Sequence, residues 1–137
     1  MWSEGAAYNI GFADALNSWR DAIRPNGFLV VSELSWLHKE PPEEVQLFFD
    51  SAYPEIHSIE ANLLLIQDAG YKVLCTHTLP KESWIEGYYE ILKPRAMALL
   101  EHEDESVRQF GAGMAEEIRI FECSENSYGY VFYVLQK

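Results

Sequence analysis

The sequence has little positive charge and no long apolar run. Against 22 aspartates and glutamates it has only 10 lysines and arginines, so its 137 residues carry a formal net charge of -12. This deficit argues against binding to the phosphates of a nucleic acid, which requires clustered positive charge. No uninterrupted apolar stretch approaches the roughly 20 residues that span a bilayer, so we expect no membrane partner.

Cysteine and histidine are sparse and scattered. Cys75 and Cys123 lie far apart in the sequence, and no histidine pairs with a cysteine or another histidine at metal-ligand spacing, so we expect no metal site. The first dozen residues contain Glu4 but no lysine or arginine, and therefore lack the pattern of a secretory signal. Two reduced thiols are typical of a cytoplasmic protein, which is the location we expect.

The composition predicts one folded domain that covers residues 1–137. The hydrophobic share is 48% and the charged share 23%, which are close to those of average globular proteins. The length suffices for one domain with a core. No internal repeat or linker divides the chain.

Several segments show helical periodicity or helix-end signals. Residues 9–24 form an apolar stripe that ends at Pro-Asn-Gly, and residues 105–121 repeat apolar side chains at helical spacing. Two prolines at 41–42 begin a segment that should be helical to about residue 52, and Ser58 is a candidate N-cap for a helix that closes at Gly70. Residues 83–86 match a capping box at the start of a long helix that Pro94 should kink or break.

Three segments are predicted to be strands, at residues 28–34, 71–78 and 127–136. The first and last are apolar on both alternating faces, which is typical of inner strands that are covered on both sides. The succession of strand, helices and strand between residues 28 and 78 predicts a parallel crossover. Only residues 1–4 remain to pair beside strand 28–34, so the sheet looks incomplete, and such an edge invites pairing with another chain.

Several strings of residues resemble the class I S-adenosylmethionine-dependent methyltransferases of the small-molecule type. They are Trp-Ser-Glu-Gly-Ala-Ala-Tyr-Asn-Ile-Gly-Phe at 2–12, Trp-Arg at 19–20 ahead of the Pro-Asn-Gly turn, Val-Val-Ser-Glu-Leu-Ser-Trp at 30–36 and Tyr-Gly-Tyr at 128–130. The resemblance implies an α/β fold, the C-terminal half of a Rossmann-like methyltransferase domain. In that fold strands 28–34 and 71–78 are the fifth and sixth, and the antiparallel tail is inserted between them.

The resemblance also implies that a part of the family pattern is missing. The glycine-rich turn after the first strand and the acidic residue that ends the second strand, both of which contact the cofactor, have no counterpart in this chain. The one local candidate is Gly-Ala-Gly at 111–113, which lies within a helical pattern and has no strand before it. Two glycines that ease close helix packing explain it better.

Candidate site residues follow from the rule that ligands bind beyond the carboxyl ends of parallel strands. We expect Glu33 to be the catalytic residue, as a base or substrate anchor, and we assign Glu4 and Gly5 to the cofactor. The alternative for the two glutamates is that they are solvated carboxylates or caps. Candidates for substrate binding are Tyr8, Asn9, Trp36, Trp84, Tyr88 and Tyr130. For each aromatic residue, core packing is the alternative.

Together these observations predict the C-terminal fragment of a methyltransferase that uses S-adenosylmethionine and acts on a small-molecule methyl acceptor. Without the glycine-rich motif, we expect the isolated chain to be inactive. Its expected protein partner is either a second copy or a complementing N-terminal half. The alternative function is a non-catalytic binding module that reuses the half-fold and self-associates.

Overall fold

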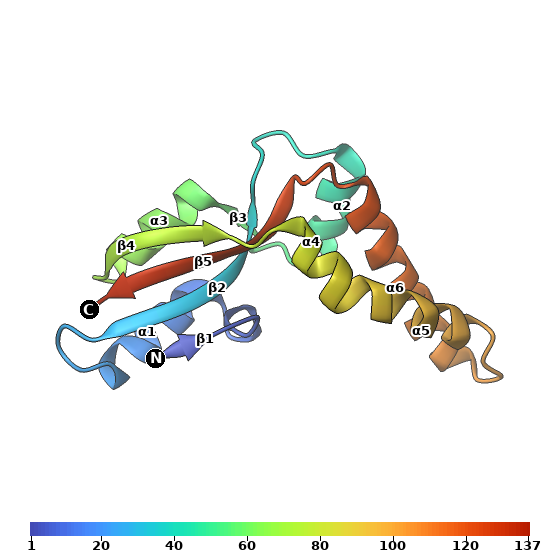
Figure 1. Ribbon diagram of the computed structural model, residues 1–137, viewed down its shortest axis with the longest axis horizontal. Helices are drawn as coiled ribbons and strands as arrows, with labels where there is room; N and C mark the ends of the chain where they lie inside the picture. The colour runs from blue at the N-terminus through green and yellow to red at the C-terminus, as the bar shows by residue number, and fades with distance from the viewer.

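A mixed sheet organises the chain (Figure 1). The computed structural model describes residues 1–137. The strand order is β1 (Trp2–Ser3), β2 (Phe28–Trp36), β5 (Tyr128–Gln136) and β4 (Lys72–Thr78), and β3 (His57–Ser58) pairs with the end of β2. β1 and β3 run parallel to β2, whereas β5 is antiparallel to both β2 and β4.

The strand predictions are confirmed. Each of the three main strands begins and ends within two residues of its expected bounds. Because β2 and β4 are both antiparallel to β5, they are parallel to each other, as the crossover between them requires. The C-terminal strand β5 lies between β2 and β4, as the resemblance implied.

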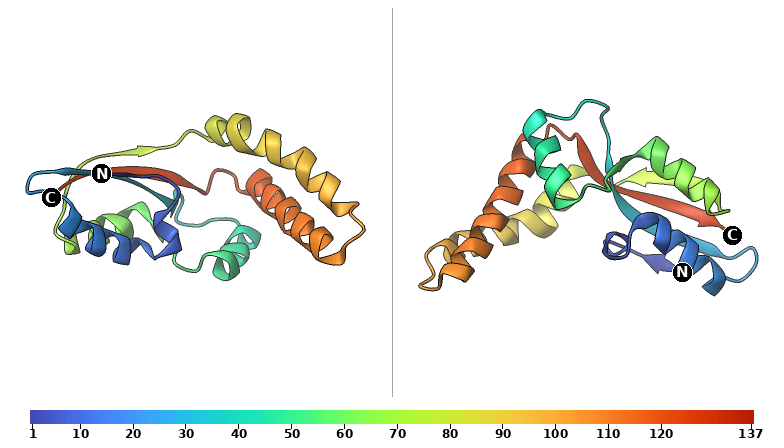
Figure 2. Two further views of the ribbon diagram at one scale, coloured as in Figure 1. Left: turned by 90° about the horizontal axis from the view of Figure 1, so that it is seen from below. Right: turned by 180° about the vertical axis from the view of Figure 1, so that it is seen from behind.

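Two helices cover one face of the sheet. α1 (Phe12–Ala22) and α3 (Ile59–Asp68) lie side by side on that face (Figure 2, left). Leu16 and Ile66 from these helices are fully buried against Leu29, Tyr133 and Leu135 from the central strands. Burial of this apolar layer is the main stabilisation of the sheet. We call the sheet with α1 and α3 the sheet lobe.

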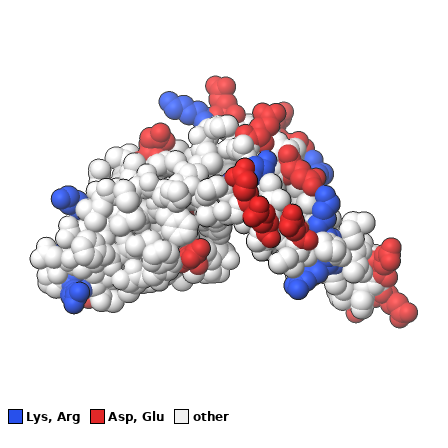
Figure 3. Space-filling view, in the orientation of Figure 1, with Lys and Arg blue, Asp and Glu red and all other residues white.

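Most of the opposite face of the sheet is bare. Trp2 and Phe28 on it are 65% and 53% exposed, and Phe132 and Val134 are only partly buried. Figure 3 views this face and shows few charged side chains on it. The expectation that these strands are covered on both faces is therefore wrong, because the remaining helices pack elsewhere. The strand expected at 71–78 is β4, which forms the sheet edge and is mostly exposed.

A buried polar contact joins α3 to the sheet. The Asn62 side-chain nitrogen donates to Ser35 Oγ at 3.0 Å and to the Tyr133 hydroxyl at 3.2 Å. All three residues are buried, so these bonds offset the cost of removing the polar groups from water. They position α3 on β2 and β5.

The other helices form a second lobe, which we call the helical lobe. It consists of α2 (Glu43–Ala52), α4 (Lys81–Trp84), the π-helical turn η2 (Ile85–Tyr89), α5 (Glu90–Leu100) and α6 (Glu105–Cys123). α5 and α6 form a hairpin that extends away from the sheet (Figures 1 and 2). The lobe has its own core, which includes Phe49, Leu92 and Phe121. No helix is both long and apolar enough to cross a membrane.

The helix starts agree with the sequence in one case and differ in another. Ser58 caps α3 by accepting a bond from the Ala61 N–H at 3.2 Å, as expected. The capping box at Ser83 is wrong, because α4 begins at Lys81, directly after Pro80. Pro94 does not break its helix but lies inside α5, and the irregular geometry is the π-helical turn that precedes α5.

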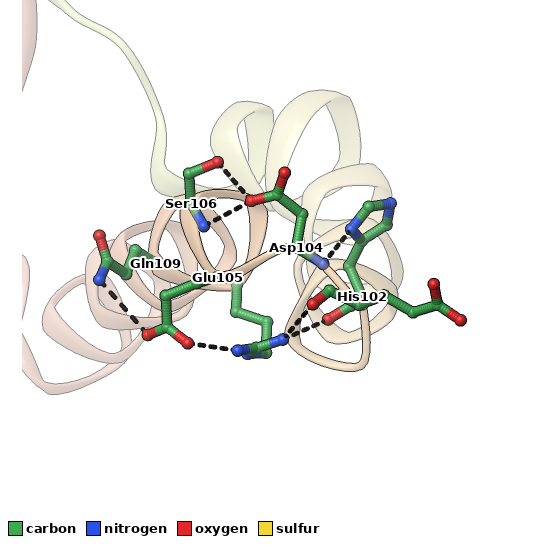
Figure 4. Close-up of polar contacts among 7 residues, drawn as sticks. His102, Asp104, Glu105, Ser106 and Gln109 are labelled. Atoms are coloured by element: carbon green, nitrogen blue, oxygen red, sulfur yellow. Dashed lines mark hydrogen bonds and ion pairs between the residues drawn. The ribbon is translucent and has the colours of Figure 1, made fainter.

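The turn between α5 and α6 is held by its own polar residues (Figure 4). Asp104 caps α6 by accepting from the Ser106 N–H at 2.8 Å, and His102 Nδ1 accepts from the Asp104 N–H at 3.1 Å. Arg108 donates to the carbonyls of His102 and Glu103, each at 2.8 Å, and pairs with Glu105. These bonds satisfy backbone groups that the ends of the two helices leave free.

Of the two glycines in α6, one is required by packing. A Cβ at Gly111 would lie 2.8 Å from the Cβ of Leu99 on α5, whereas a Cβ at Gly113 would meet nothing within 4 Å. The expectation that both glycines ease close packing is therefore confirmed for Gly111 and wrong for Gly113.

Gly111→Ala and Gly113→Ala should change stability in opposite directions. The first forces α5 and α6 apart and should lower the free energy of unfolding by about 1–3 kcal/mol. The second should raise it by up to about 1 kcal/mol, because alanine has the higher helix propensity. Urea unfolding of both variants measures the two effects. Equal effects would show that the hairpin is not closely packed at Gly111.

Candidate functional site

A cavity of about 600 Å³ lies where the two lobes meet. On the sheet side it is lined by Ser32 and Leu34 near the end of β2, by Tyr130 and Phe132 of β5, and by residues that follow β1. It therefore opens at the carboxyl ends of the parallel strands β1 and β2, where open α/β sheets bind ligands.

The helical lobe supplies the other walls. Tyr53 comes from the end of α2, and Trp84, Tyr88 and Tyr89 come from α4 and the π-helical turn. Glu117 on α6 completes this side. The wider π-helical turn puts two consecutive tyrosines on the same cavity, and such turns occur often at functional sites.

Stacked rings hold the walls in place. Trp84 stacks on Tyr130 with ring centroids 4.9 Å apart and an interplanar angle of 11°, which joins the helical lobe to the sheet. Tyr89 stacks on Phe121 at 4.1 Å, and Tyr8 meets Tyr53 edge-on at 6.2 Å. Contacts of this kind add to the stabilisation that burial provides.

The loop after β1 lies tightly against β2. Gly5 has a φ of +56°, a conformation that side chains disfavour, and its N–H donates to Ser32 Oγ at 2.8 Å. A Cβ at Gly5 would lie 3.7 Å from the Tyr130 hydroxyl. The glycine therefore lets the backbone and any ligand approach closely at this strand end.

Three tyrosine hydroxyls of the cavity, those of Tyr88, Tyr89 and Tyr130, are neutral at pH 7. Burial raises the pKa of Tyr130 to about 12. Burial also raises the pKa of Tyr89, and the pKa of Tyr88 rises through burial and the nearby Glu117 carboxylate. The Tyr89 hydroxyl donates to Glu117 Oε1 at 3.4 Å. The hydroxyls thus act as hydrogen-bond donors and acceptors, and the charge on the walls comes from Glu4 and Glu117.

The structure brings together six of the nine site residues expected from the sequence. Those that line the cavity are Glu4, Gly5, Tyr8, Trp84, Tyr88 and Tyr130. Asn9 does not line it, and its side chain donates to the Ala6 carbonyl of its own loop at 3.1 Å. Trp36 also lies outside, packed edge-on against Phe49 and Tyr128 in the core of the helical lobe. Trp36 is therefore a core residue, which is the alternative given above for each aromatic residue.

Glu33 is the third expected residue outside the cavity walls. It is only 3% exposed, and its carboxylate accepts a bond from the Tyr53 hydroxyl at 2.7 Å. Tyr53 does line the cavity, so its hydroxyl connects Glu33 to the cavity. Burial raises the pKa of Glu33 to about 7, although the bonds from Tyr53 and the backbone lower it, and the charge of Glu55 raises it further.

Sequence reasoning missed several cavity residues. Three of them, Tyr53, Tyr89 and Glu117, belong to no motif. The expected site residues came only from the rule that ligands bind at strand ends and from the resemblance. Tyr89 had a weak signal, because it follows the expected Tyr88. No group of three or more His, Cys, Asp or Glu side chains is arranged to hold a metal ion.

The fold is similar to those of solved methyltransferases and of a solved cyclase. An S-adenosylmethionine-dependent methyltransferase from Geobacter sulfurreducens, solved with S-adenosyl-L-homocysteine, matches at a TM-score of 0.71 and 18% identity, over 98% of this chain and 56% of that one. Phosphoethanolamine N-methyltransferase 2 from Haemonchus contortus, in complex with phosphomonomethylethanolamine and S-adenosylhomocysteine, matches at 0.69 and 12%, over 99% and 32%. The (4+2)-cyclase SpnF matches at 0.69 and 15%, over 99% and 48%.

These matches establish the fold. No family model and no curated protein matches the sequence. The chain spans about half the length of two of the three structures and about a third of the other. It has the α/β fold of part of a class I methyltransferase, which confirms at the level of fold the resemblance found in the sequence.

The buried Glu33 should make stability depend on pH. Its pKa rises from the ordinary 4.5 to about 7 on folding, so the folded protein favours the protonated carboxyl. The stability that it contributes is present at low pH and is lost as pH rises from about 4.5 through 7, by about 3 kcal/mol in total. Glu33→Gln should remove this loss.

Urea unfolding of Glu33→Gln and the parent chain between pH 4.5 and 8 measures the difference. The variant should gain on the parent as pH rises. The exposed Glu40→Gln variant is the control and should follow the parent at every pH. Parallel stability curves for Glu33→Gln and the parent would contradict the assignment.

Proposed function

We propose that residues 1–137 are the substrate-side, C-terminal portion of an S-adenosylmethionine-dependent methyltransferase domain that acts on a small molecule. The observation that carries the proposal is the cavity at the carboxyl ends of β1 and β2. Its volume of about 600 Å³ is in the range of small-molecule sites, roughly 300–1,000 Å³. The likeness to solved methyltransferases supports the same assignment.

The strand end at Glu4, Gly5 and Tyr8 fits one side of the cofactor. A carboxylate and an aromatic ring both attract a positive sulfonium, and Gly5 permits close approach. When bound, the cofactor supplies an electrophilic methyl group. The cavity has no lysine or arginine for the cofactor carboxylate and no glycine-rich turn after a strand. In this proposal, a complementing N-terminal half makes those contacts with the cofactor.

The bare face of the sheet supports such a half. Phe28, Phe132 and Val134 present an apolar surface that a layer of helices would cover, as α1 and α3 cover the other face. The structures that match are longer than this chain. In this proposal the complement belongs to a longer protein or a separate chain, and residues 1–137 alone do not methylate.

The chain's own residues orient the acceptor and handle its proton. The aromatic walls exclude water and hold a planar or apolar group, while the tyrosine hydroxyls fix its direction. An acceptor that loses a proton passes it to the Tyr53 oxygen as the Tyr53 hydroxyl proton moves to Glu33. A pKa of about 7 suits Glu33 to accept a proton at neutral pH. Glu33 thus acts through Tyr53.

The state of the two cysteines relates to the cellular compartment in which the protein acts. Cys75 and Cys123 are both free, and Cys75 is exposed on the edge strand β4. An exposed free thiol is typical of a reducing compartment, which supports the cytoplasm as the place where the protein acts.

The cofactor side of the proposal is tested by nuclear magnetic resonance. With ¹⁵N-labelled 137-residue chain, S-adenosylmethionine should shift the amide signals of Glu4, Gly5 and Tyr8 at millimolar concentration. Glu4→Gln should weaken this binding about fivefold, which corresponds to about 1 kcal/mol. The isolated chain should release no S-adenosylhomocysteine.

Glu103→Gln, in the turn between α5 and α6, is the matched control and should leave the titration unchanged. Absence of shifts at the three amides in a folded chain would contradict the proposal. So would shifts that are confined to residues outside the cavity.

The bare face also favours a second function, a non-catalytic module that self-associates. Trp2 and Phe28 are its most exposed rings, and pairing of two such faces would bury them. Light scattering separates the two functions. A dimer that Phe28→Lys converts to a monomer, and that gives no shifts with S-adenosylmethionine, would favour the module. A monomer that gives those shifts favours the methyltransferase portion.

A further inference from the structure

The cavity carries negative charge at both ends. Glu4 follows β1 on the sheet side, and Glu117 projects from α6 on the helical side. No lysine or arginine is among the 18 lining residues, and ten of them are aromatic. This combination favours a cation and disfavours an anion.

Two cations of the α5–α6 hairpin are paired with carboxylates other than Glu117. On the same helix, Arg119 pairs with Glu44 at 2.7 Å and with Glu116 at 2.8 Å. Lys93 on α5 pairs with Glu122 at 2.8 Å. The Glu117 carboxylate instead accepts a long bond of 3.4 Å from the neutral Tyr89 hydroxyl. Its charge is therefore available to a ligand.

The rings beside Glu117 suit a positive group. Tyr88 is 45% exposed at the cavity, and it meets Tyr89 edge-on, with centroids 5.0 Å apart. Tyr88 stacks on no other ring, so this pair leaves a face of Tyr88 free, and ring faces attract ammonium groups. Tyr89 is stacked on Phe121 and Trp84, and it contributes its hydroxyl, which donates to Glu117. The raised pKa values of Tyr88 and Tyr89 keep both phenols uncharged at neutral pH.

We propose that Glu117, Tyr88 and Tyr89 form a subsite for the ammonium group of a small organic amine, and that the methyl acceptor belongs to this class. The assignment as acceptor rests on the proposed methyltransferase function, whereas the ammonium subsite itself does not. A phosphate- or carboxylate-bearing acceptor without an amine finds no cationic partner in the cavity.

Choline and its uncharged isostere 3,3-dimethylbutan-1-ol test the subsite, because they share shape and differ in charge. Calorimetry on the 137-residue chain should show choline binding about tenfold more tightly than the alcohol. Phosphocholine should bind more weakly than choline, because its phosphate meets only acidic walls. Equal binding of choline and the alcohol, or tighter binding of phosphocholine, would overturn the proposal.

Variants locate the subsite. Glu117→Gln should weaken choline binding about fivefold and leave binding of the alcohol unchanged. Glu122→Gln, on the same helix but exposed, should leave both unchanged. Tyr88→Leu should also weaken choline binding. An unchanged choline affinity in folded Glu117→Gln protein would overturn the assignment.

The titration with S-adenosylmethionine separates this inference from the proposed function. Amide shifts at Glu4, Gly5 and Tyr8 without a preference for choline would overturn the amine subsite alone. A preference for choline without those shifts would leave the subsite in place and remove the methyltransferase role, and with it the identification of the amine as an acceptor.

Discussion

The antiparallel pairing of β2 with β5 is the interaction on which both lobes depend. Its register runs from Phe28 opposite Gln136 to Trp36 opposite Tyr128. At one end the two strands present the apolar layer under α1 and α3, and at the other they place Leu34 and Tyr130 in the cavity. Because the partners are far apart in sequence, the loss of chain entropy must be offset by this burial.

The strands were predictable because their apolar composition is a local property. The helix details were less so. Ser83 and Glu86 satisfy the pattern of a capping box, but Pro80 already sets the start of α4 and leaves Ser83 inside the helix. Pro94 is tolerated because the backbone irregularity lies in the turn before it. The bare face could not be predicted from the sequence. Apolar composition shows that a strand surface avoids water, but it does not show whether this chain or another covers that surface.

The site residues also differ in whether the local sequence or the tertiary packing determines their positions. Gly5 and Tyr8 were found because they follow a strand end, and that rule needs no tertiary structure. Glu33 also lies near a strand end, yet side chains alternate along β2, so its neighbour Leu34 lines the cavity and Glu33 faces the other side. Glu117 comes from a helix whose position depends on packing of the whole helical lobe, and no spacing in the sequence indicates it.

The central position of β5 also affects how the protein is made. β5 follows β2 and β4 in the chain but lies between them, so neither strand has its main partner until residue 136 has left the ribosome. Until then the apolar edges of β2 and β4 are open to other nascent chains. Ribosome pausing before this point would prolong that exposure. A premature stop codon would yield a product in which no strand joins β2 to β4, suited to rapid degradation by cellular proteases.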